Sequence, residues 1–461
     1  MGKLLFGDKA FYKKVIAVSL PIMLQQGISS FVNILDTLMI GNYDTNAMSG
    51  LSIANQLFFI VNILTIGAMA TAGIYLTQYF GSQNQKGMRN CFRLKLWLGL
   101  GIMVLASLIF LFFGESLINT FLTNPESIEE KNAILGYAKT YLLLLIFTLV
   151  PFTISQAYSS SLRETGETIK PMIAGALGVA VNVILNLWLI FGGLGIPALG
   201  VVGAGIATII ARFVEMIFLI IVTHCNKSKY TFIQGAYKSV KVPTNLIKNV
   251  LIKGAPLIIN EFMWSLGMTV LLNLYSVRGT TVLSAFSISY TVTNLFYIVF
   301  GAMATATSVM VGQQLGAGKL ENAVDNDRKL IIFSLIVCAI FGMILACIAP
   351  FVPHLYSDAT VEARELSTKF MLVIAGCMVI FAFNSECFYT LRAGGVTFVT
   401  FLFDSLFIWV VAITSCYFLI HYTNLNIVLI YFIVQILELI KSVIGFALIK
   451  SKIWVKNLVS K

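Results

Sequence analysis

The chain has 461 residues, of which 58% are apolar and only 11% are charged, and its net charge is +11. A soluble globular protein carries about 25% charged residues, so this composition excludes a water-soluble fold. The positive charge does not indicate nucleic-acid binding, because the basic residues of a membrane protein collect on its cytoplasmic side. Seven cysteines show no spacing typical of a metal site, and we interpret them as small core residues.

Apolar stretches long enough to cross a bilayer recur along the whole chain. Stretches such as 98–113 are solidly apolar and favour helices, whereas barrel strands would alternate apolar and polar residues. Twelve spans are predicted, at 15–40, 47–73, 92–113, 134–160, 169–192, 198–223, 248–276, 281–311, 329–352, 364–391, 396–421 and 425–449. The predicted fold class is an all-α polytopic membrane protein with twelve transmembrane helices in two six-helix, pseudo-symmetric bundles.

The connections between these spans predict the domains and the orientation. Residues 1–223 form an N-terminal bundle, 224–247 a polar, basic cytoplasmic linker, and 248–461 a C-terminal bundle. One set of connections holds 24 Lys and Arg residues and the alternate set holds five. Because cytoplasmic loops are enriched in Lys and Arg, we expect a multi-pass protein of the cell membrane with both termini cytoplasmic.

The two halves also repeat each other in sequence. Residues 67–72 recur letter for letter at 301–306, and Leu162-Arg163 answers Leu391-Arg392 at a similar offset. Two such bundles with the same orientation should be related by an axis along the membrane normal. Their arrangement favours a transporter whose substrate site lies between the halves and opens to either side by rocking.

Four polar side chains and one carboxylate reach similar depth in the outer half of the first bundle. Asp36 lies about 6 Å inside the first span, with Asn33 on the same helical face. Asn182 and Asn186 share a face of the fifth span, and Thr208 lies in the sixth. This set predicts a site for a proton or a small cation, since an acid within a span is costly and marks function. Hydrogen bonding between helices is the alternative for the amides and the hydroxyl.

The second half contains a carboxylate near the middle of a span. Glu261 follows Pro256 by five residues, with no basic residue in that span placed to neutralise it. We predict that it couples transport to a cation, a proton or the substrate, and a protonated structural carboxyl is the alternative. Pro21 and Pro256 are predicted to let the first and seventh spans bend.

Three further polar residues lie nearer the cytoplasmic end of the second half. They are Asn384, Glu386 and Asp404. For each of them a hydrogen-bonded structural role competes with a role in coupling. Asn384 is the candidate that would join Glu261 in a second-half coupling site.

Several ordered motifs together resemble the multidrug and toxic compound extrusion (MATE) family, prokaryotic type. They cover essentially the whole chain: Ser19-Leu-Pro21, residues 32–37, 161–168, Asn182-x-x-x-Asn186, 203–208, Asn260-Glu261 and 391–395. The resemblance implies an antiporter, not an enzyme, that exports lipophilic and often cationic small molecules in exchange for H⁺ or Na⁺. It implies no cofactor beyond that ion, and we expect a monomer in the lipid bilayer.

The resemblance also assigns residues to roles. Asp36, Asn182, Asn186 and Thr208 match the family's cation site in the first half, and Glu261 matches its carboxylate in the second half. Two positions depart from the family pattern. Asn186 stands where many relatives have Asp, which slightly favours a proton over Na⁺. The acid of the sodium-coupled branch falls near Phe381, where this chain has none.

Two other classes of membrane protein fit the sequence less well. A lipid-linked oligosaccharide flippase, or another non-drug transporter of the same two-bundle plan, is the main alternative, but the spans contain few of the basic residues that would hold pyrophosphate. An intramembrane enzyme would need a catalytic constellation at one depth, and the sequence shows none.

Overall fold

A computed structural model describes residues 6–41, 43–122, 127–193, 195, 197–356 and 359–460. Within the first helix the side chains at 32–35, 37 and 38 lie outside the described part. The predicted site residue Asn33 therefore has a described backbone but no described side chain. The described residues form helices connected by short loops, and no β-strand element occurs among them.

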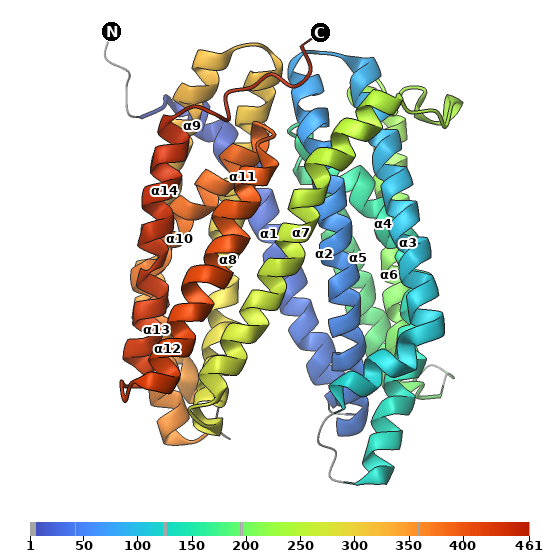
Figure 1. Ribbon diagram of the computed structural model, residues 1–461. Helices are drawn as coiled ribbons and strands as arrows, with labels where there is room; N and C mark the ends of the chain where they lie inside the picture. The colour runs from blue at the N-terminus through green and yellow to red at the C-terminus, as the bar shows by residue number, and fades with distance from the viewer. Residues whose placement is uncertain are drawn as a thin grey trace. The chain divides into compact units, whose positions relative to one another are not determined.

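Ten long helices and two composite ones make up the fold (Figure 1). The first ten are α1 (Lys9–Gly41), α2 (Thr45–Gly81), α3 (Gln85–Phe121), α4 (Ile128–Glu164), α5 (Ile169–Phe191), α6 (Gly200–Cys225), α7 (Thr244–Ser276), α8 (Thr280–Gly316), α9 (Leu320–Ile348) and α10 (Val361–Ala393). The eleventh joins α11 (Thr397–Phe401), π-helical turns at Leu402–Leu406 and Ile408–Ile413, and α12 (Thr414–Tyr422). The twelfth joins α13 (Ile427–Ile436) and α14 (Glu438–Lys450).

The prediction of twelve spans is confirmed, although several helices are longer than predicted. The span predicted at 47–73, for example, corresponds to α2, which continues to Gly81. The polar residues at helix ends remain helical outside the hydrocarbon, so hydropathy alone does not detect them. Among the described residues, eleven of these helices, all except α1, meet a combined criterion of length and hydropathy for crossing a membrane.

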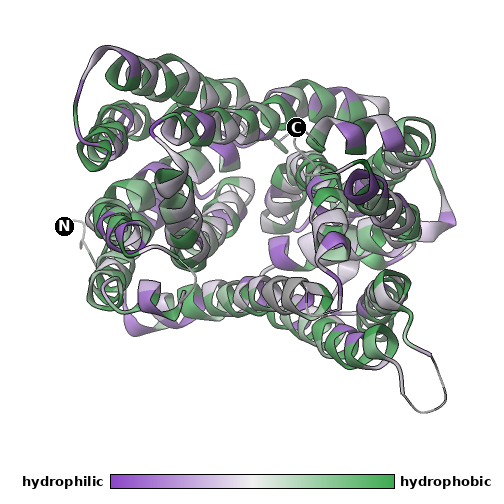
Figure 2. Ribbon diagram, turned by 90° about the horizontal axis from the view of Figure 1, so that it is seen from below, coloured by the Kyte–Doolittle hydropathy of each residue, from purple (hydrophilic) through white to green (hydrophobic). Residues whose placement is uncertain are grey.

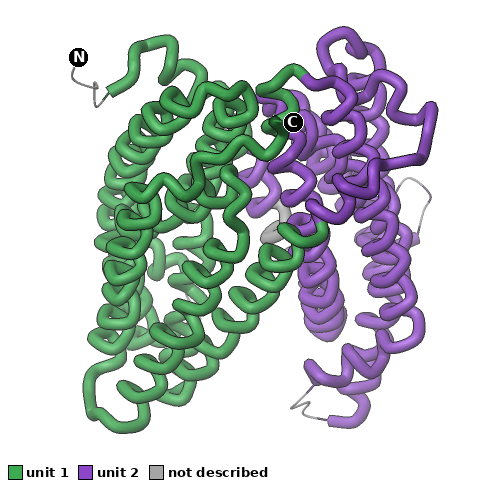
Figure 3. The backbone as a smooth tube through the Cα atoms, turned by 45° about the horizontal axis from the view of Figure 1, so that its top comes forward, with its two compact units in different colours: residues 1–23, 77–83, 251–461 green, residues 24–76, 84–250 purple. Residues whose placement is uncertain are grey.

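The chain packs as two compact units (Figure 3). Unit 1 contains residues 1–23, 77–83 and 251–461, and unit 2 contains residues 24–76 and 84–250. Each unit has its own apolar core: Phe370 and Met378 lie in that of unit 1, and Leu142 and Leu149 in that of unit 2. The domain boundaries at 223 and 248 remain a prediction. Within unit 1, the start of α1 and the end of the chain lie at the same end, at the top of Figure 1.

The repeat seen in the sequence has a local structural counterpart at the ends of α4 and α10. Gly166 and Gly395 both have positive φ, 86° and 71°. Each glycine N–H bonds back to the preceding Arg carbonyl, and the next residue bonds to the Leu carbonyl of the Leu-Arg pair. These two bonds form the Schellman motif, which needs a residue in the left-handed region and therefore favours glycine. The same three residue types thus end both helices.

The exterior of the helices is apolar. Large side chains such as Phe112, Phe113 and Ile184 are more than half exposed, and apolar residues dominate most helices in Figure 2. A soluble protein would not expose so much apolar surface. In hydrocarbon the same side chains are well solvated, while the helices satisfy their own backbone groups.

Candidate functional site

Small residues bring α5 and α6 close together in unit 2. A Cβ atom at Gly203 would lie 2.4 Å from the carbonyl oxygen of Leu189, so only glycine permits this approach. The N–H of Leu199 also donates to that carbonyl, at 2.9 Å. Close helix contact through small residues is the usual way in which membrane helices associate. It places the polar face of α5 against Thr208 of α6.

The structure brings Asp36 together with the predicted residues of α5 and α6. Asn186 Nδ2 donates to Asp36 Oδ1 at 2.7 Å and to Asn182 Oδ1 at 3.2 Å. Asn182 Nδ2 in turn donates to Thr208 Oγ1 at 3.4 Å. Asn182 and Asn186 are buried, whereas Asp36 is half-buried. We call these four residues the Asp36 cluster.

The Asp36 cluster has oxygen atoms that can bind a further ligand. Turning the amide of Asn182 lets its nitrogen donate to both Asp36 oxygens, at 3.0 and 3.2 Å. The Oδ1 atom of Asn186 is buried and has no hydrogen-bond partner among the described residues. Amide and carboxylate oxygens are ligands that hard cations prefer. The donor set therefore suits either a proton on Asp36 or a small cation.

Two residues near the Asp36 cluster were missed by sequence reasoning. Tyr141 of α4 is buried and its hydroxyl interacts with Thr208. Arg212 of α6 lies close enough for its charge to act on Asp36. Arg212 forms an ion pair with Glu215 at 2.9 Å, as their i, i+3 spacing allows, and its charge acts on Asp36 without a direct contact in the described part of the chain. The one sequence signal for this role is that Arg212 follows Thr208 by one helical turn.

Glu261 lies in the middle of α7 and is half-buried. Among the described residues it makes no hydrogen bond or ion pair. The charges of Arg392 and Asp404 act on it from other helices of unit 1. The prediction that no base of its own span neutralises Glu261 is therefore accurate, but Arg392 of α10 supplies positive charge nearby.

Asn384 belongs to a different network from Glu261. Its Nδ2 donates to Glu438 Oε2 at 2.8 Å, and its Oδ1 accepts from Ser442 at 2.8 Å. No hydrogen bond joins it to Glu261 in the described part of the chain. The pair expected for a second-half site is thus not joined directly, because the amide of Asn384 turns toward α14.

Asp404 is satisfied by partners from two other helices. Lys441 Nζ lies 2.6 Å from its Oδ1, and Asn260 Nδ2 donates to its Oδ2 at 3.1 Å. The pairing of Lys441 with Glu438, expected from their spacing, is present at 3.7 Å. Glu386 differs from Asp404, because neither of its buried oxygens has a hydrogen-bond partner among the described residues. Its structural or coupling role therefore stays a prediction.

Both predicted bending points lie inside helices, Pro21 in α1 and Pro256 in α7. The packing of α1 passes from unit 1 to unit 2 just after Met23. Pro21 therefore stands next to the point where the helix changes unit. A proline leaves a gap in the helical hydrogen bonds, which makes bending inexpensive.

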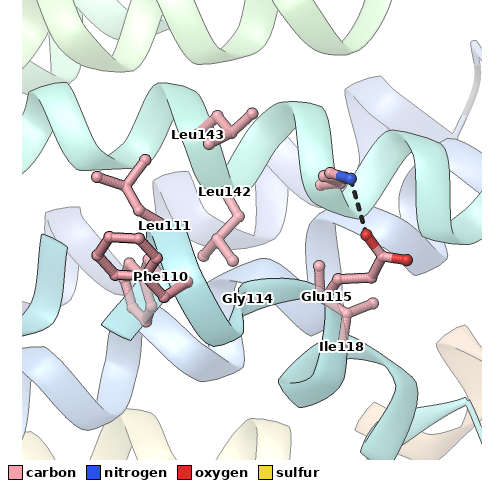
Figure 4. A pocket seen from close by; sticks show the side chains of 9 residues that line it. Phe110, Leu111, Gly114, Glu115, Ile118, Leu142 and Leu143 are labelled. Carbon is pink, nitrogen blue, oxygen red and sulfur yellow. Dashed lines mark hydrogen bonds and ion pairs between the residues drawn. The ribbon is translucent and has the colours of Figure 1, made fainter. Parts of the chain in front are cut away.

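Two cavities lie away from these residues. One of about 120 Å³ lies between α3 and α4, beside the exposed ion pair of Glu115 with Lys139 (Figure 4). The other, of about 600 Å³, is lined by α8 residues such as Ser287 and Thr291 together with Leu355. Neither is lined by a predicted site residue.

The family follows from the comparison with known proteins. The profile of the MatE family matches residues 21–188 and 256–418, more than half of the chain. This chain belongs to the MatE family. The predicted resemblance is confirmed, and the family consists of membrane transporters rather than enzymes.

The relatives of this MatE protein span nearly its whole length. A probable multidrug resistance protein NorM of Thermotoga maritima is 27% identical over 420 residues, covering 90% of this chain and 87% of that protein. The probable multidrug resistance protein YoeA of Bacillus subtilis is 22% identical over 411 residues, covering 88% and 86%. The solved outward-facing conformation of a multidrug resistance MATE family transporter has a TM-score of 0.86 at 20% identity, covering 97% of this chain and 96% of that one. The last likeness shows a common fold.

Proposed function

We propose that this MatE protein is a secondary active multidrug efflux antiporter of the cell membrane. It exports lipophilic, often cationic small molecules in exchange for H⁺ or Na⁺ by alternating access, as a monomer with both termini cytoplasmic. The names of its relatives support the substrate class. The observation that carries the coupling mechanism is the Asp36 cluster, an acid within a span held by amides from α5.

The Asp36 cluster can sense an ion because its charge is expensive where it stands. Asp36 lies five residues before the end of α1, about 8 Å inside the helix end. Its negative charge is tolerated there through Asn186 and the nearby Arg212. A proton or a cation that binds the carboxyl neutralises it and lowers the cost of moving α1 into apolar surroundings.

Exchange requires that the ion and the drug favour different states. A ligand shifts a conformational equilibrium only by its differential affinity for the two states. Neutral Asp36 lets α1 repack, and bending at Pro21 transmits the change along the helix. Asn186 in place of a second acid leaves a single carboxylate in the Asp36 cluster, which favours a proton over Na⁺ as the coupling ion.

The test is ethidium efflux from vesicles that contain the purified full-length protein. We expect the unmutated protein to accelerate efflux under an imposed ion gradient. Efflux driven by a pH gradient is compared with efflux driven by a Na⁺ gradient, and the effective gradient identifies the coupling ion. Asp36→Asn mimics the neutral state permanently, so its efflux should no longer respond to either gradient.

Asp44→Asn is the matched control. Asp44 accepts hydrogen bonds from the Ala47 N–H and the Tyr137 hydroxyl near the start of α2, and asparagine caps a helix about as well. This variant should keep the gradient response. If Asp36→Asn also keeps the full response, the coupling charge lies elsewhere and the proposed role of Asp36 is wrong.

A further inference from the structure

Unit 1 contains two fully buried acids that the coupling scheme above does not use. Asp327 of α9 is 1% exposed and Glu386 of α10 is 0% exposed. Neither forms an ion pair within the described part of the chain, and the charge of Asp327 acts on Glu386. The hydroxyl of Thr390 donates to Asp327 Oδ1. Buried carboxylates without a cationic partner cost several kcal/mol, so this pair calls for a counter-charge.

The surroundings of Glu386 hold four oxygen atoms without partners. They are both carboxyl oxygens of Glu386, the hydroxyl of Thr307 on α8 and the hydroxyl of Ser334 on α9. All three side chains are 0% exposed. The two hydroxyls interact with the carboxyl but do not reach hydrogen-bond geometry with it. Buried polar atoms are almost always satisfied, and a bound ion is one explanation when they are not.

The matching helices of the first half show how such a group is neutralised. Lys95 of α3 is 0% exposed, and its ammonium contacts Ser160 Oγ at 2.9 Å, Ser161 Oγ at 3.3 Å and Glu164 Oε2 at 2.6 Å. There the chain supplies its own cation to two hydroxyls and a carboxylate. Ser161 precedes Leu162-Arg163 as Thr390 precedes Leu391-Arg392, so α9 and α10 correspond to α3 and α4.

The second half keeps only part of this arrangement. Ser161 corresponds to Thr390, but Glu164 corresponds to Ala393 at the same offset, so Glu386 is an acid for which the first half has no counterpart. At the offset that relates Gly81 to Gly316, the position of Lys95 corresponds to Leu330. Glu386 and Thr390 are four residues apart and share a face of α10. Glu386 lies seven residues from the end of α10, and Asp327 seven from the start of α9. Each acid is therefore about 10 Å from the same end of the helix pair, and Thr390 lies nearer that end than Glu386.

We propose that Glu386, Thr307 and Ser334 bind one Na⁺ ion, with Asp327 adding negative charge beside the site. A proton on Glu386 would form one hydrogen bond and so give partners to two of the four orphaned oxygens, whereas a small cation coordinates several oxygens at once. The ligands are all oxygen atoms, which suits a hard cation. The site differs from the Asp36 cluster and from Glu261, and it does not depend on the proposed role of either.

The test is thermal unfolding of the purified full-length protein as a function of Na⁺ at constant ionic strength, with choline as the replacing cation. The measurement is made in the Asp36→Asn variant, so that Na⁺ binding at the Asp36 cluster cannot contribute to the stabilisation. A ligand that binds the folded state raises the unfolding temperature in a saturable manner. We expect that rise with Na⁺ in the Asp36→Asn background, and we expect Glu386→Gln to abolish it. Glu365→Gln, at an exposed acid of the same helix, should leave it intact.

Ser334→Ala provides a second variant that keeps both charges. Loss of one oxygen ligand should raise the Na⁺ concentration for half-maximal stabilisation roughly tenfold or more. The proposal is overturned if the Asp36→Asn protein shows no Na⁺-dependent stabilisation, if Glu386→Gln retains it, or if Ser334→Ala leaves its midpoint unchanged. A stabilisation that follows pH but not Na⁺ would identify Glu386 as a proton site and would likewise overturn it.

Discussion

The half-buried carboxyls within the helices of this protein differ in what they touch. Asp404 has a lysine at 2.6 Å and an amide at 3.1 Å, so its charge is compensated within the protein. Asp36 is held by the amide of Asn186 at 2.7 Å, and Glu261 has no hydrogen bond or ion pair among the described residues. The less a buried acid is compensated internally, the more its energy depends on an external ion. Asp36 and Glu261 are therefore better coupling candidates than Asp404.

Glu261→Gln tests the coupling role in the second half. Glutamine keeps the shape of the side chain and removes the charge, so we expect a folded protein whose gradient-driven ethidium efflux is abolished or falls at least about tenfold. The measurement is efflux from vesicles together with the unfolding temperature. Glu321→Gln, at an exposed acid near the start of α9, is the control. Gradient-driven efflux at the unmutated rate in Glu261→Gln would exclude Glu261 as a coupling residue.

At the scale of the helix, the π-helical turns of the eleventh span orient a polar network. Such turns commonly occur at functional sites. The turn at Leu402–Leu406 contains Asp404, which reaches Lys441 on α14, and Ser405, which donates to Asn260 Oδ1 on α7 at 2.7 Å. Three helices of unit 1 are thereby connected through hydrogen bonds in their interior.

Lys441→Met should strongly destabilise this network. The lysine side chain is 10% exposed and lies near both Asp404 and Glu438, so its removal leaves two half-buried acids without their cation. Removing one partner of a buried ion pair costs about 3–5 kcal/mol. We expect the free energy of unfolding, measured by SDS titration, to fall by that amount. Adding Asp404→Asn to the variant should restore part of it. Lys450→Met, at the exposed end of α14, is the control, and an equal loss there would argue against the network.

Outside the membrane, the connection between α4 and α5 is tied to the segment after α6. Lys229 Nζ and the Tyr230 hydroxyl both donate to Glu167 Oε2. Burial raises the pKa of Glu167, but these hydrogen bonds outweigh it and hold the pKa below 4.5. The hydrogen bond to Glu167 raises the pKa of Lys229 above 10.5. The contact is thus charged across the neutral range.

Glu167→Gln should lower the unfolding temperature at neutral pH by a small amount, since a partly exposed ion pair contributes at most about 1 kcal/mol. A carboxyl whose folded-state pKa is lowered stabilises the fold above its unfolded pKa. The difference between the two proteins should therefore shrink as the pH falls through the pKa of folded Glu167. Thermal unfolding from pH 7 to pH 3 measures it. A difference that stays constant over this range would show that the charge of Glu167 is not responsible.

At the scale of the whole molecule, the asymmetry of basic residues predicts the orientation in the membrane. The connections predicted on one side of the membrane hold 24 Lys and Arg residues, and those predicted on the other side hold five. Because this bias sets orientation, a tag placed after residue 461 should react with an impermeant label only after the cells are permeabilised. A tag inserted near Phe351, between α9 and α10, should react in intact cells. Labelling of the C-terminal tag in intact cells would reverse the predicted topology.

Much of the fold could be predicted because it depends on local properties of the chain. The length of each apolar stretch determines a membrane helix, as the prediction at 169–192 and the observed α5 (Ile169–Phe191) show. The Asp36 cluster was also predictable in part, because Asn182 and Asn186 share a helical face and depth along a span follows from the rise per residue. Which residues of other helices meet that face does not follow from the helical period.

The sequence by itself determined the membrane helices, the repeat of the two halves and the depth at which each buried polar residue lies. The i, i+3 pair of Glu438 with Lys441 is also a local feature, because neighbours on one helix follow from its period. Only the tertiary structure decided that Lys441 lies closest to Asp404, that Asn384 bonds to α14 rather than to Glu261, and that Glu386 faces Thr307 and Ser334. These contacts join different helices, and the rotation and packing of helices against each other are set by many side chains acting together.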